Sequence, residues 1–286
     1  MSEAPNLPPE VLAAARRTVA MTLPGMEAVL VTKDLRYTDV TGDHLRLDVY
    51  RPPSLGAAER RPAVIFIHGG GPGGLPMKDM GAFTSYGRLV AAQGMVGVTF
   101  THRLSWPVTR LLDGAADVAA ALAQVRANAA AWNIDADRLA IIAFSAGGPM
   151  LSPWLRDAPA DVRALVAMYP VLEIEGSEAH RACETAETLA AWSPLAQLAR
   201  PGRKPPLFLA RAGGDAIPGL LAGLDAFVAE ALAQDYPLTL INNSGAAHGF
   251  DIGEPTPRTL EVMTTMFGFL QSQLGVDAAR ASAGSV

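Results

Sequence analysis

Ser145 is the residue whose type and setting most favour chemistry, because it follows an apolar run and lies in the segment Ala143-Phe144-Ser145-Ala146-Gly147. A serine hydroxyl becomes a useful nucleophile when a tight turn exposes it at a helix N-terminus, within reach of a base. Such a turn needs small residues, and Ala143 and Gly147 meet that need, although glycine is more usual at the first position. In a chain rich in alanine and glycine the match is weak alone. It predicts a nucleophile only if other segments supply a base and an acid.

A histidine and an aspartate further along the chain can supply them. His248 lies among alanines and a glycine, which leaves its imidazole free to reach a neighbouring strand end. Asp215 follows two glycines ahead of a helical stretch, where an aspartate taken alone is usually a helix cap. With a histidine partner, Asp215 would instead hold the imidazole in the right tautomer. His248 would then take the proton of Ser145 and later return one to a leaving group.

The glycine-rich run His68-Gly69-Gly70-Gly71 is the expected site of oxyanion stabilisation. Glycines let the backbone approach a ligand closely. We expect the N–H groups of Gly70, Gly71 and Ala146 to bind a tetrahedral oxyanion, where losing one donor costs on the order of 3 kcal/mol. A phosphate loop is disfavoured because no Gly-Lys-Ser/Thr follows, and a plain flexible loop stays open. His68 is expected to hold the loop by hydrogen bonds rather than to act in catalysis.

Short apolar runs precede these segments and predict strands that are buried on both faces of a parallel sheet. Ligands of such sheets bind beyond the carboxyl ends of the strands, which is where all four segments lie. Helical stretches between the runs predict helices on both faces. Residues 28–37 and 44–50 alternate and predict an antiparallel pair with one wet face, which includes Asp48. The expected apolar strands are 63–67, 95–100, 139–144, 164–168, 207–209 and 238–241, and the expected helices are 80–92, 113–132, 217–234 and 257–274.

The composition fits a single α/β domain over residues 1–286, since half of the residues are hydrophobic and 18% are charged. Residues 1–25 are expected to include a helix that helps to cover the site. The interval 170–205 is expected to form connecting helices or a small cap, and residues 276–286 a disordered tail. The single cysteine, Cys183, excludes an internal disulfide and a multi-cysteine metal site.

The charge pattern bears on partners and location. The net charge is −5 and basic residues form no run, which disfavours nucleic acid as a partner. No stretch is long and apolar enough to predict a membrane span. The first residues are acidic and polar, where a signal peptide would be basic and then apolar, so a cytoplasmic protein is the expectation.

The order Ser145, Asp215, His248, each after a different strand, is the chain order of the α/β-hydrolase triad. With the His-Gly-Gly-Gly run at 68–71, the chain resembles esterases and lipases of that fold. It is similar to hormone-sensitive-lipase-like carboxylesterases and to the feruloyl-esterase-like branch. The similarity extends over most of the chain, beginning at the Leu-Asp-Val-Tyr-Arg-Pro run at 47–52.

This resemblance implies an α/β-hydrolase fold with a mostly parallel eight-stranded sheet, helices on both faces and a small cap. It implies hydrolysis through an acyl-enzyme, with Ser145, Asp215 and His248 as the triad and with no metal or organic cofactor. Ala143 and Phe144 stand where hormone-sensitive-lipase-like enzymes usually have Gly-Asp. A feruloyl-esterase-like or dienelactone-hydrolase-like placement therefore stays open.

The expected substrates are small to medium, fairly apolar carboxylic esters. Phe144, Trp192 and Phe250 are the expected pocket walls, because two of them adjoin the serine and the histidine. Amidase or formamidase activity, lactonase activity and acyl transfer use the same triad and stay open, as does a non-catalytic ligand-binding protein with this fold. The expected partner is a small-molecule ester, and a homodimer is left open.

Overall fold

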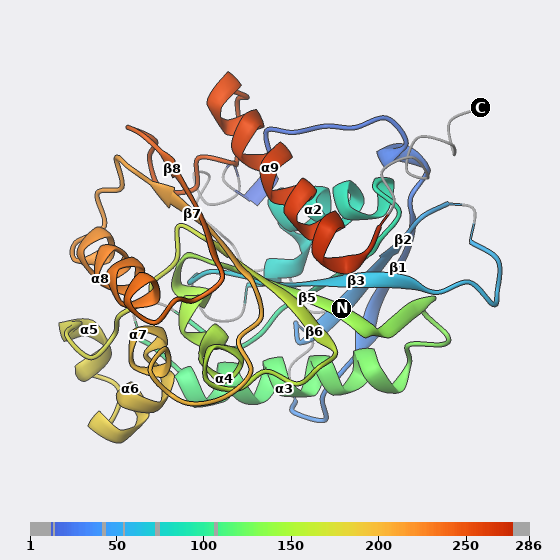
Figure 1. Cartoon of the computed structure of the whole chain (residues 1–286). Coiled ribbons are helices and arrows are strands. Elements are labelled where there is room, and N and C mark those ends of the chain that lie inside the picture. Colours follow the sequence, from blue (N-terminus) through green and yellow to red (C-terminus); the bar gives the residue numbers. More distant parts are fainter. Residues whose placement is uncertain are drawn as a thin grey trace.

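An eight-stranded sheet forms the centre of the computed structural model, which describes residues 13, 15–41, 44–53, 55–71, 75–105 and 108–276 (Figure 1). The strands are β1 (Leu30–Arg36), β2 (Arg46–Arg51), β3 (Arg61–Ile67), β4 (Val96–Phe100), β5 (Ile134–Phe144), β6 (Val162–Met168), β7 (Leu207–Ala212) and β8 (Leu238–Asn243). They follow the order β1-β2-β4-β3-β5-β6-β7-β8. β2 pairs antiparallel with β1 and β4, and the remaining pairs are parallel.

Helices cover both faces of the sheet. They are η1 (Met26–Ala28), η2 (Met77–Asp79), α2 (Gly81–Ala92), α3 (Leu111–Ala127), η3 (Ser145–Leu151), α4 (Ser152–Arg156), α5 (Glu178–Arg181), α6 (Ala186–Trp192), α7 (Pro194–Gln197), α8 (Leu220–Ala233) and α9 (Pro257–Leu274). The apolar sides of α2 and α9 pack on one face, which we call the α2–α9 face. Those of α3, α4 and α8 pack on the other, the α3–α4–α8 face.

Alternate residues of the central strands fill the two cores. In β3, Ile65 belongs to the core on the α3–α4–α8 face and Phe66 to the core on the α2–α9 face. In β5, Ile141 and Ile142 divide in the same way. Both faces are apolar because both are covered, which explains the continuous apolar runs in the sequence.

β8 and α8 depart from the expected burial. β8 was expected to be buried on both faces, but it is an edge of the sheet and Leu240 is 41% exposed. An edge strand has a neighbour on one side only, so its side chains are less covered. On α8, Leu224, Phe227 and Ala231 form the buried face, whereas Leu232 points to solvent although it shares their helical spacing.

Asp48 is the clearest correction, because the face of β2 that was predicted to be wet is buried. The side chain is 0% exposed, since η2 and α2 pack over this face. A buried carboxylate needs a partner, and Lys78 Nζ lies 3.0 Å from Asp48 Oδ1. The buried Lys78 also lies 2.7 Å from Asp34 Oδ1 and 2.8 Å from Asp79 Oδ1. This cluster ties η2 to the first two strands.

The interval 170–205 contains α5, α6 and α7, where connecting helices or a small cap were expected. α7 packs on α4 and α8, and Leu172 and Leu189 join the core of that face. A Glu184 carboxylate oxygen accepts the backbone N–H of Leu111, 3.0 Å away, at the start of α3. These short helices therefore extend the α3–α4–α8 layer toward the carboxyl edge of the sheet.

The expected N-terminal helix falls largely on residues 1–12 and 14, which lie outside the described residues, as do residues 277–286 of the expected tail. The N–H of Val19 donates to Ser85 Oγ, and Val19 pairs with Ile252 in an isolated bridge. This segment therefore lies beside the loop that follows β8. Across the described ranges, no helix has the length and apolarity to cross a membrane.

Candidate active site

Ser145 lies where β5 ends and the 3₁₀ helix η3 begins. Its φ of 51° is in the left-handed region, which a non-glycine residue adopts only when its surroundings hold it there. The turn is tightly packed: a Cβ on Gly147 would lie 2.6 Å from the carbonyl oxygen of His68, and one on Gly148 would lie 2.1 Å from that of Val171. Glycines here let the turn approach the segments after β3 and β6, and this packing holds the serine at the carboxyl edge of the sheet.

His248 and Asp215 form a hydrogen-bonded chain with this serine. His248 Nε2 lies 2.7 Å from Ser145 Oγ, and His248 Nδ1 lies 2.5 Å from Asp215 Oδ2. The carboxylate accepts a proton held on Nδ1, which leaves Nε2 free to accept the serine hydroxyl. The Asp215 side chain is 0% exposed and that of His248 is 26% exposed, so the acid is sheltered while the base can be reached. This arrangement can take a proton from Ser145 and return one to a leaving group.

The loops after β7 and β8 are fastened to each other, which fixes the acid against the base. The N–H of Gly214 donates to the carbonyl oxygen of Ala246 at 2.8 Å. A Cβ on Gly214 would lie 2.6 Å from the carbonyl oxygen of Gly245, so the close approach requires glycine. The second carboxylate oxygen of Asp215 accepts the N–H of Ile217 at 3.0 Å. Asp215 therefore makes a local turn bond as well as its bond to the imidazole.

The glycine loop after β3 passes directly beside the serine. A Cβ on Gly69 would lie 3.0 Å from Ser145 Cβ and 3.5 Å from its Oγ. His68 Nδ1 donates to the carbonyl oxygen of Gly69 at 2.7 Å, and His68 Nε2 accepts the N–H of His102 at 3.1 Å. Both bonds require the neutral imidazole with its proton on Nδ1. His68 thus holds the loop through hydrogen bonds.

Gly70 and Gly71, two of the expected oxyanion donors, lie in this loop, and the third, Ala146, follows the serine. A Cβ on Gly71 would lie 3.0 Å from Met77 Sδ, so the loop packs on η2. η2 is in turn fixed by the carboxylates around Lys78. The use of these N–H groups for an oxyanion stays a prediction.

The buried histidines behind the loop should make the fold less stable in acid. Burial lowers the pKa of His68 to about 4 and lowers that of His102 well below its ordinary value. An unfolded histidine has a pKa near 6.5, so between these values the unfolded state binds protons that the folded state does not. The contribution of His68 is therefore complete above about pH 6.5 and is lost as the pH falls toward 4, by about 2 kcal/mol at pH 5.

Urea unfolding at pH 7 and pH 5 measures this loss. The variant His68→Gln cannot titrate at that position and should show a smaller difference between the two pH values. The variant His44→Gln, in the loop between β1 and β2, is the matched control and should keep the full difference. An equal loss in wild type and His68→Gln would contradict the prediction.

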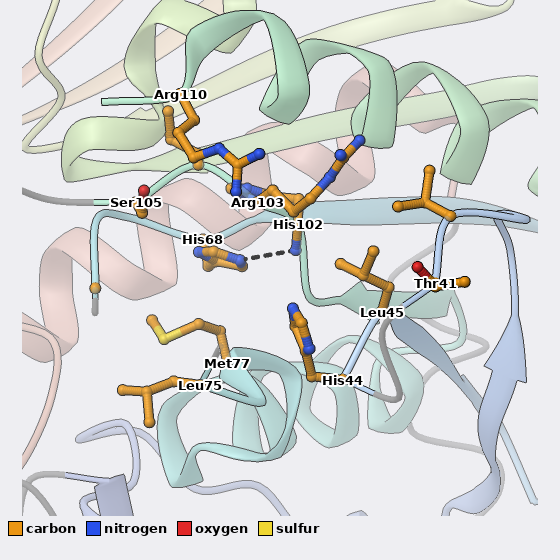
Figure 2. Close-up of a pocket in the computed structure, with 13 residues that line it drawn as sticks. Thr41, His44, Leu45, His68, Leu75, Met77, His102, Arg103, Ser105 and Arg110 are labelled. Carbon is orange, nitrogen blue, oxygen red and sulfur yellow. Dashed lines mark hydrogen bonds between the residues drawn. The ribbon is translucent and has the colours of Figure 1, made fainter. Parts of the chain in front are cut away.

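A cavity of about 290 Å³ lies between the glycine loop and the segments after β1 and β4 (Figure 2). The rings of His68 and His102 stack in its wall with centroids 3.4 Å apart. Arg103 is paired with Asp117 at 2.8 Å and with Asp113 at 3.2 Å, so its charge is balanced within the protein. Among the described residues, no group of three or more His, Cys, Asp or Glu side chains is placed to hold a metal ion. The cavity is lined by Val40, Thr41, His44, Leu45, His68, Gly71, Leu75, Met77, His102, Arg103, Leu104, Ser105 and Arg110.

The aromatic residues expected to wall a substrate pocket do not line this cavity. Phe144 is 4% exposed, and its ring packs 5.2 Å from that of Tyr86 in the core of the α2–α9 face. The alternation along β5 directs it there, so Phe144 is a core residue rather than a pocket wall. Trp192 is half-buried against the α3–α4–α8 core, and Phe250 is half-buried against the α2–α9 core. Trp106, also considered as a wall, lies outside the described residues.

Tyr169 and Asp251 were not singled out from the sequence, although both lie close to the histidine. Tyr169 follows β6 directly, has a φ of 39°, and packs its ring against the imidazole of His248 with centroids 4.7 Å apart. Asp251 is 0% exposed and accepts the hydroxyl hydrogen of Tyr86. The sequence marks both residues only weakly. Tyr169 lies at a strand end, as Ser145 does, and Asp251 is an acidic residue between two apolar ones.

Two sequence comparisons find similarity over part of the chain. The BD-FAE family model matches residues 47–152, a segment that includes the glycine loop and Ser145. Carboxylesterase 3B of Mus musculus is 30% identical over 129 residues, which are 43% of this chain. The match spans only 22% of the length of that carboxylesterase.

Solved structures of esterases share the fold. Esterase 2 of Thermogutta terrifontis, phosphoramylated by tabun, has a TM-score of 0.68 at 23% identity and covers 88% of this chain and 97% of its own. Esterase B from Lactobacillus rhamnosis, inhibited with a tributyrin phosphonate, has a TM-score of 0.72 at 18% identity and covers 93% and 90%. The expected eight-stranded, mostly parallel sheet with helices on both faces is confirmed. The chain therefore has the α/β-hydrolase fold of these esterases, and over part of its length it is similar to the BD-FAE family model and to a carboxylesterase.

Proposed function

We propose that the protein is a serine hydrolase that cleaves carboxylic esters of small to medium, apolar substrates. One observation carries this proposal: Ser145, His248 and Asp215 form a continuous hydrogen-bonded chain at the carboxyl edge of the sheet. The strained turn at Ser145 and the glycine loop beside it support the same chemistry. The similarity to BD-FAE and to carboxylesterase 3B supports an ester as the substrate.

The reaction would proceed through an acyl-enzyme. His248 Nε2 takes the hydroxyl proton as Ser145 Oγ attacks the ester carbonyl carbon, and Asp215 stabilises the imidazolium that forms. N–H groups of Ala146 and of the glycine loop bind the tetrahedral oxyanion. When the intermediate collapses, the carbon–oxygen bond to the alcohol breaks and His248 protonates the departing oxygen. A water molecule, deprotonated by His248, then attacks the acyl-enzyme and releases the carboxylic acid together with free Ser145.

Covalent labelling tests the nucleophile directly. A fluorophosphonate should add one phosphonyl group to the native protein, and peptide mass spectrometry should place it on Ser145, because a nucleophile activated by a base reacts where other serines do not. Ser145→Ala should abolish the labelling. Ser244→Ala removes an exposed serine from the loop before His248 and should leave it unchanged. No label on folded protein would contradict the proposal and favour a ligand-binding role.

A substrate panel separates ester hydrolysis from its relatives. The same acyl group offered as a p-nitrophenyl ester, an anilide and a formamide, with a lactone of similar size, compares the reactions that share this triad. Faster turnover of the ester supports the proposal. Preference for the amide, the formamide or the lactone would replace carboxylesterase by one of those activities.

A further inference from the structure

We propose that Asp251 is a second, buried carboxylate behind the triad, which, together with Tyr86 and Tyr169, positions the imidazole of His248 and supports the positive charge that develops on it; this rests on the proposed function. Asp215 is the acid that contacts the imidazole directly. Asp251 is a positioning residue that acts from behind.

The first support is the placement of the carboxyl group. Asp251 follows His248 by three residues, in a loop where the N–H of Ile252 donates to the carbonyl oxygen of Gly249 at 3.0 Å. The N–H of Ala20 donates to the main-chain carbonyl oxygen of Asp251 at 2.7 Å. The side chain is 0% exposed. The loop that carries the base is thus fixed with an aspartate side chain turned into the core.

The second support is that the partners of this carboxyl come from distant parts of the chain. The hydroxyl of Tyr86, on α2, donates to Asp251 Oδ2. The hydroxyl of Tyr169, after β6, lies near the same carboxyl group and lowers its pKa. Burying an acid in the α2–α9 core costs stability unless the group is hydrogen-bonded. Tyr86 satisfies one oxygen of this carboxyl group, and Oδ1 has no hydrogen-bond partner among the described residues. Such a buried acid next to the base costs stability, which indicates that it has a function.

The third support is the contact between this group and the base. The Tyr169 ring meets the His248 ring at 63° with centroids 4.7 Å apart, and it meets the Phe250 ring at 5.7 Å. Tyr169 therefore contacts the imidazole with its ring, and its hydroxyl lies on the side of Asp251. The route from Asp251 through Tyr169 to His248 fixes the plane of the imidazole.

Charge gives the same conclusion. Burial raises the pKa of Asp251, whereas the hydroxyls of Tyr86 and Tyr169 and the charge on His248 lower it. Two further charged groups lie at the surface of this loop: Arg17, which donates to the carbonyl oxygen of Ile252 at 3.3 Å, and the exposed Glu254. Burial is the largest of these influences, so the carboxylate charge of Asp251 depends on the hydroxyls and on the charge of His248 to oppose it. An ionised Asp251 attracts the imidazolium that His248 becomes when it takes the serine proton.

The test is the pH dependence of kcat/KM for a p-nitrophenyl ester in wild type and Asp251→Asn. Loss of the carboxylate removes a negative charge behind the imidazole, so the acid limb of the profile should move to lower pH by about 0.5 to 1 unit. Tyr169→Phe keeps the ring contact and removes the hydroxyl, and Tyr86→Phe removes the other donor. Both should move the limb in the same direction by less. Asp117→Asn changes a buried aspartate on α3 and should leave the limb in place.

A substrate-free readout keeps this inference separate from the proposed function. The His248 resonance of ¹³C-histidine-labelled protein, assigned by its loss in His248→Gln, should titrate at lower pH in Asp251→Asn. An unmoved titration and an unmoved acid limb would overturn the proposal even if activity falls. Absence of ester hydrolysis in wild type would overturn the function alone. If Asp251→Asn fails to fold, the two tyrosine variants decide by the same measurements.

Discussion

Replacing Ser145 with alanine should lower turnover of a p-nitrophenyl short-chain ester by at least about four orders of magnitude. The imidazole of His248 would then have no hydroxyl to activate, although its bond to Asp215 would remain. The oxyanion donors would still bind the carbonyl oxygen, so slow background hydrolysis by water is expected to persist. Steady-state assays with purified protein measure the loss, and retained full activity would reject Ser145 as the nucleophile.

The strained backbone at this position predicts a difference in stability between two inactive variants. At a φ of 51°, alanine keeps the strain of serine and glycine relieves it. Ser145→Gly should therefore be as inactive as Ser145→Ala but more stable in urea, by about 0.5 to 1 kcal/mol. Equal stability of the two variants would mean that the turn is not strained. Ser244→Ala is the matched control and should change neither activity nor stability.

The sequence allowed the central strands and the triad to be predicted because both follow from local patterns. A parallel strand covered on both faces, such as β3 or β5, must be apolar at every position, and its carboxyl end must face the ligand edge. The position of Ser145, Asp215 and His248 after three different strands was thus readable from the apolar runs and the residues that follow them. Their hydrogen-bonded contact depends on glycines whose close approaches only the fold reveals, as at Gly214.

Other features depend on partners that are distant in sequence. Asp48 alternates with apolar residues as an exposed residue would, and its burial depends on Lys78, which arrives from the segment after the glycine loop. The order of β4 and β3 in the sheet likewise depends on pairing across long separations. Tyr86 and Asp251 lie 165 residues apart, so no local pattern marks their contact. These are the places where sequence reasoning gave the wrong environment or none.

Replacing Asp215 with asparagine should lower kcat/KM by about four orders of magnitude without unfolding the protein. Asparagine is isosteric, and its amide oxygen can still accept the N–H of Ile217. Its amide nitrogen would then face His248 Nδ1 and donate to it. The imidazole would carry its proton on Nε2 and donate to Ser145, so it could no longer accept the serine proton. The loss should appear in ester turnover and in the rate of fluorophosphonate labelling.

The matched control is Asp225→Asn, the same substitution in a carboxylate that pairs with Arg211 at 2.7 Å and is 54% exposed. Exposed ion pairs contribute little to stability, so activity and stability should stay near those of wild type.

The comparison of Asp215→Asn with Asp251→Asn shows which of the two buried acids matters more for turnover. Asp215 bonds directly to the imidazole and sets its tautomer, whereas Asp251 acts through Tyr169 and through charge. The first substitution should therefore abolish most turnover, and the second should chiefly move the acid limb. A loss of less than tenfold in Asp215→Asn, or a larger loss in Asp251→Asn, would reverse the assignment of the direct partner of His248.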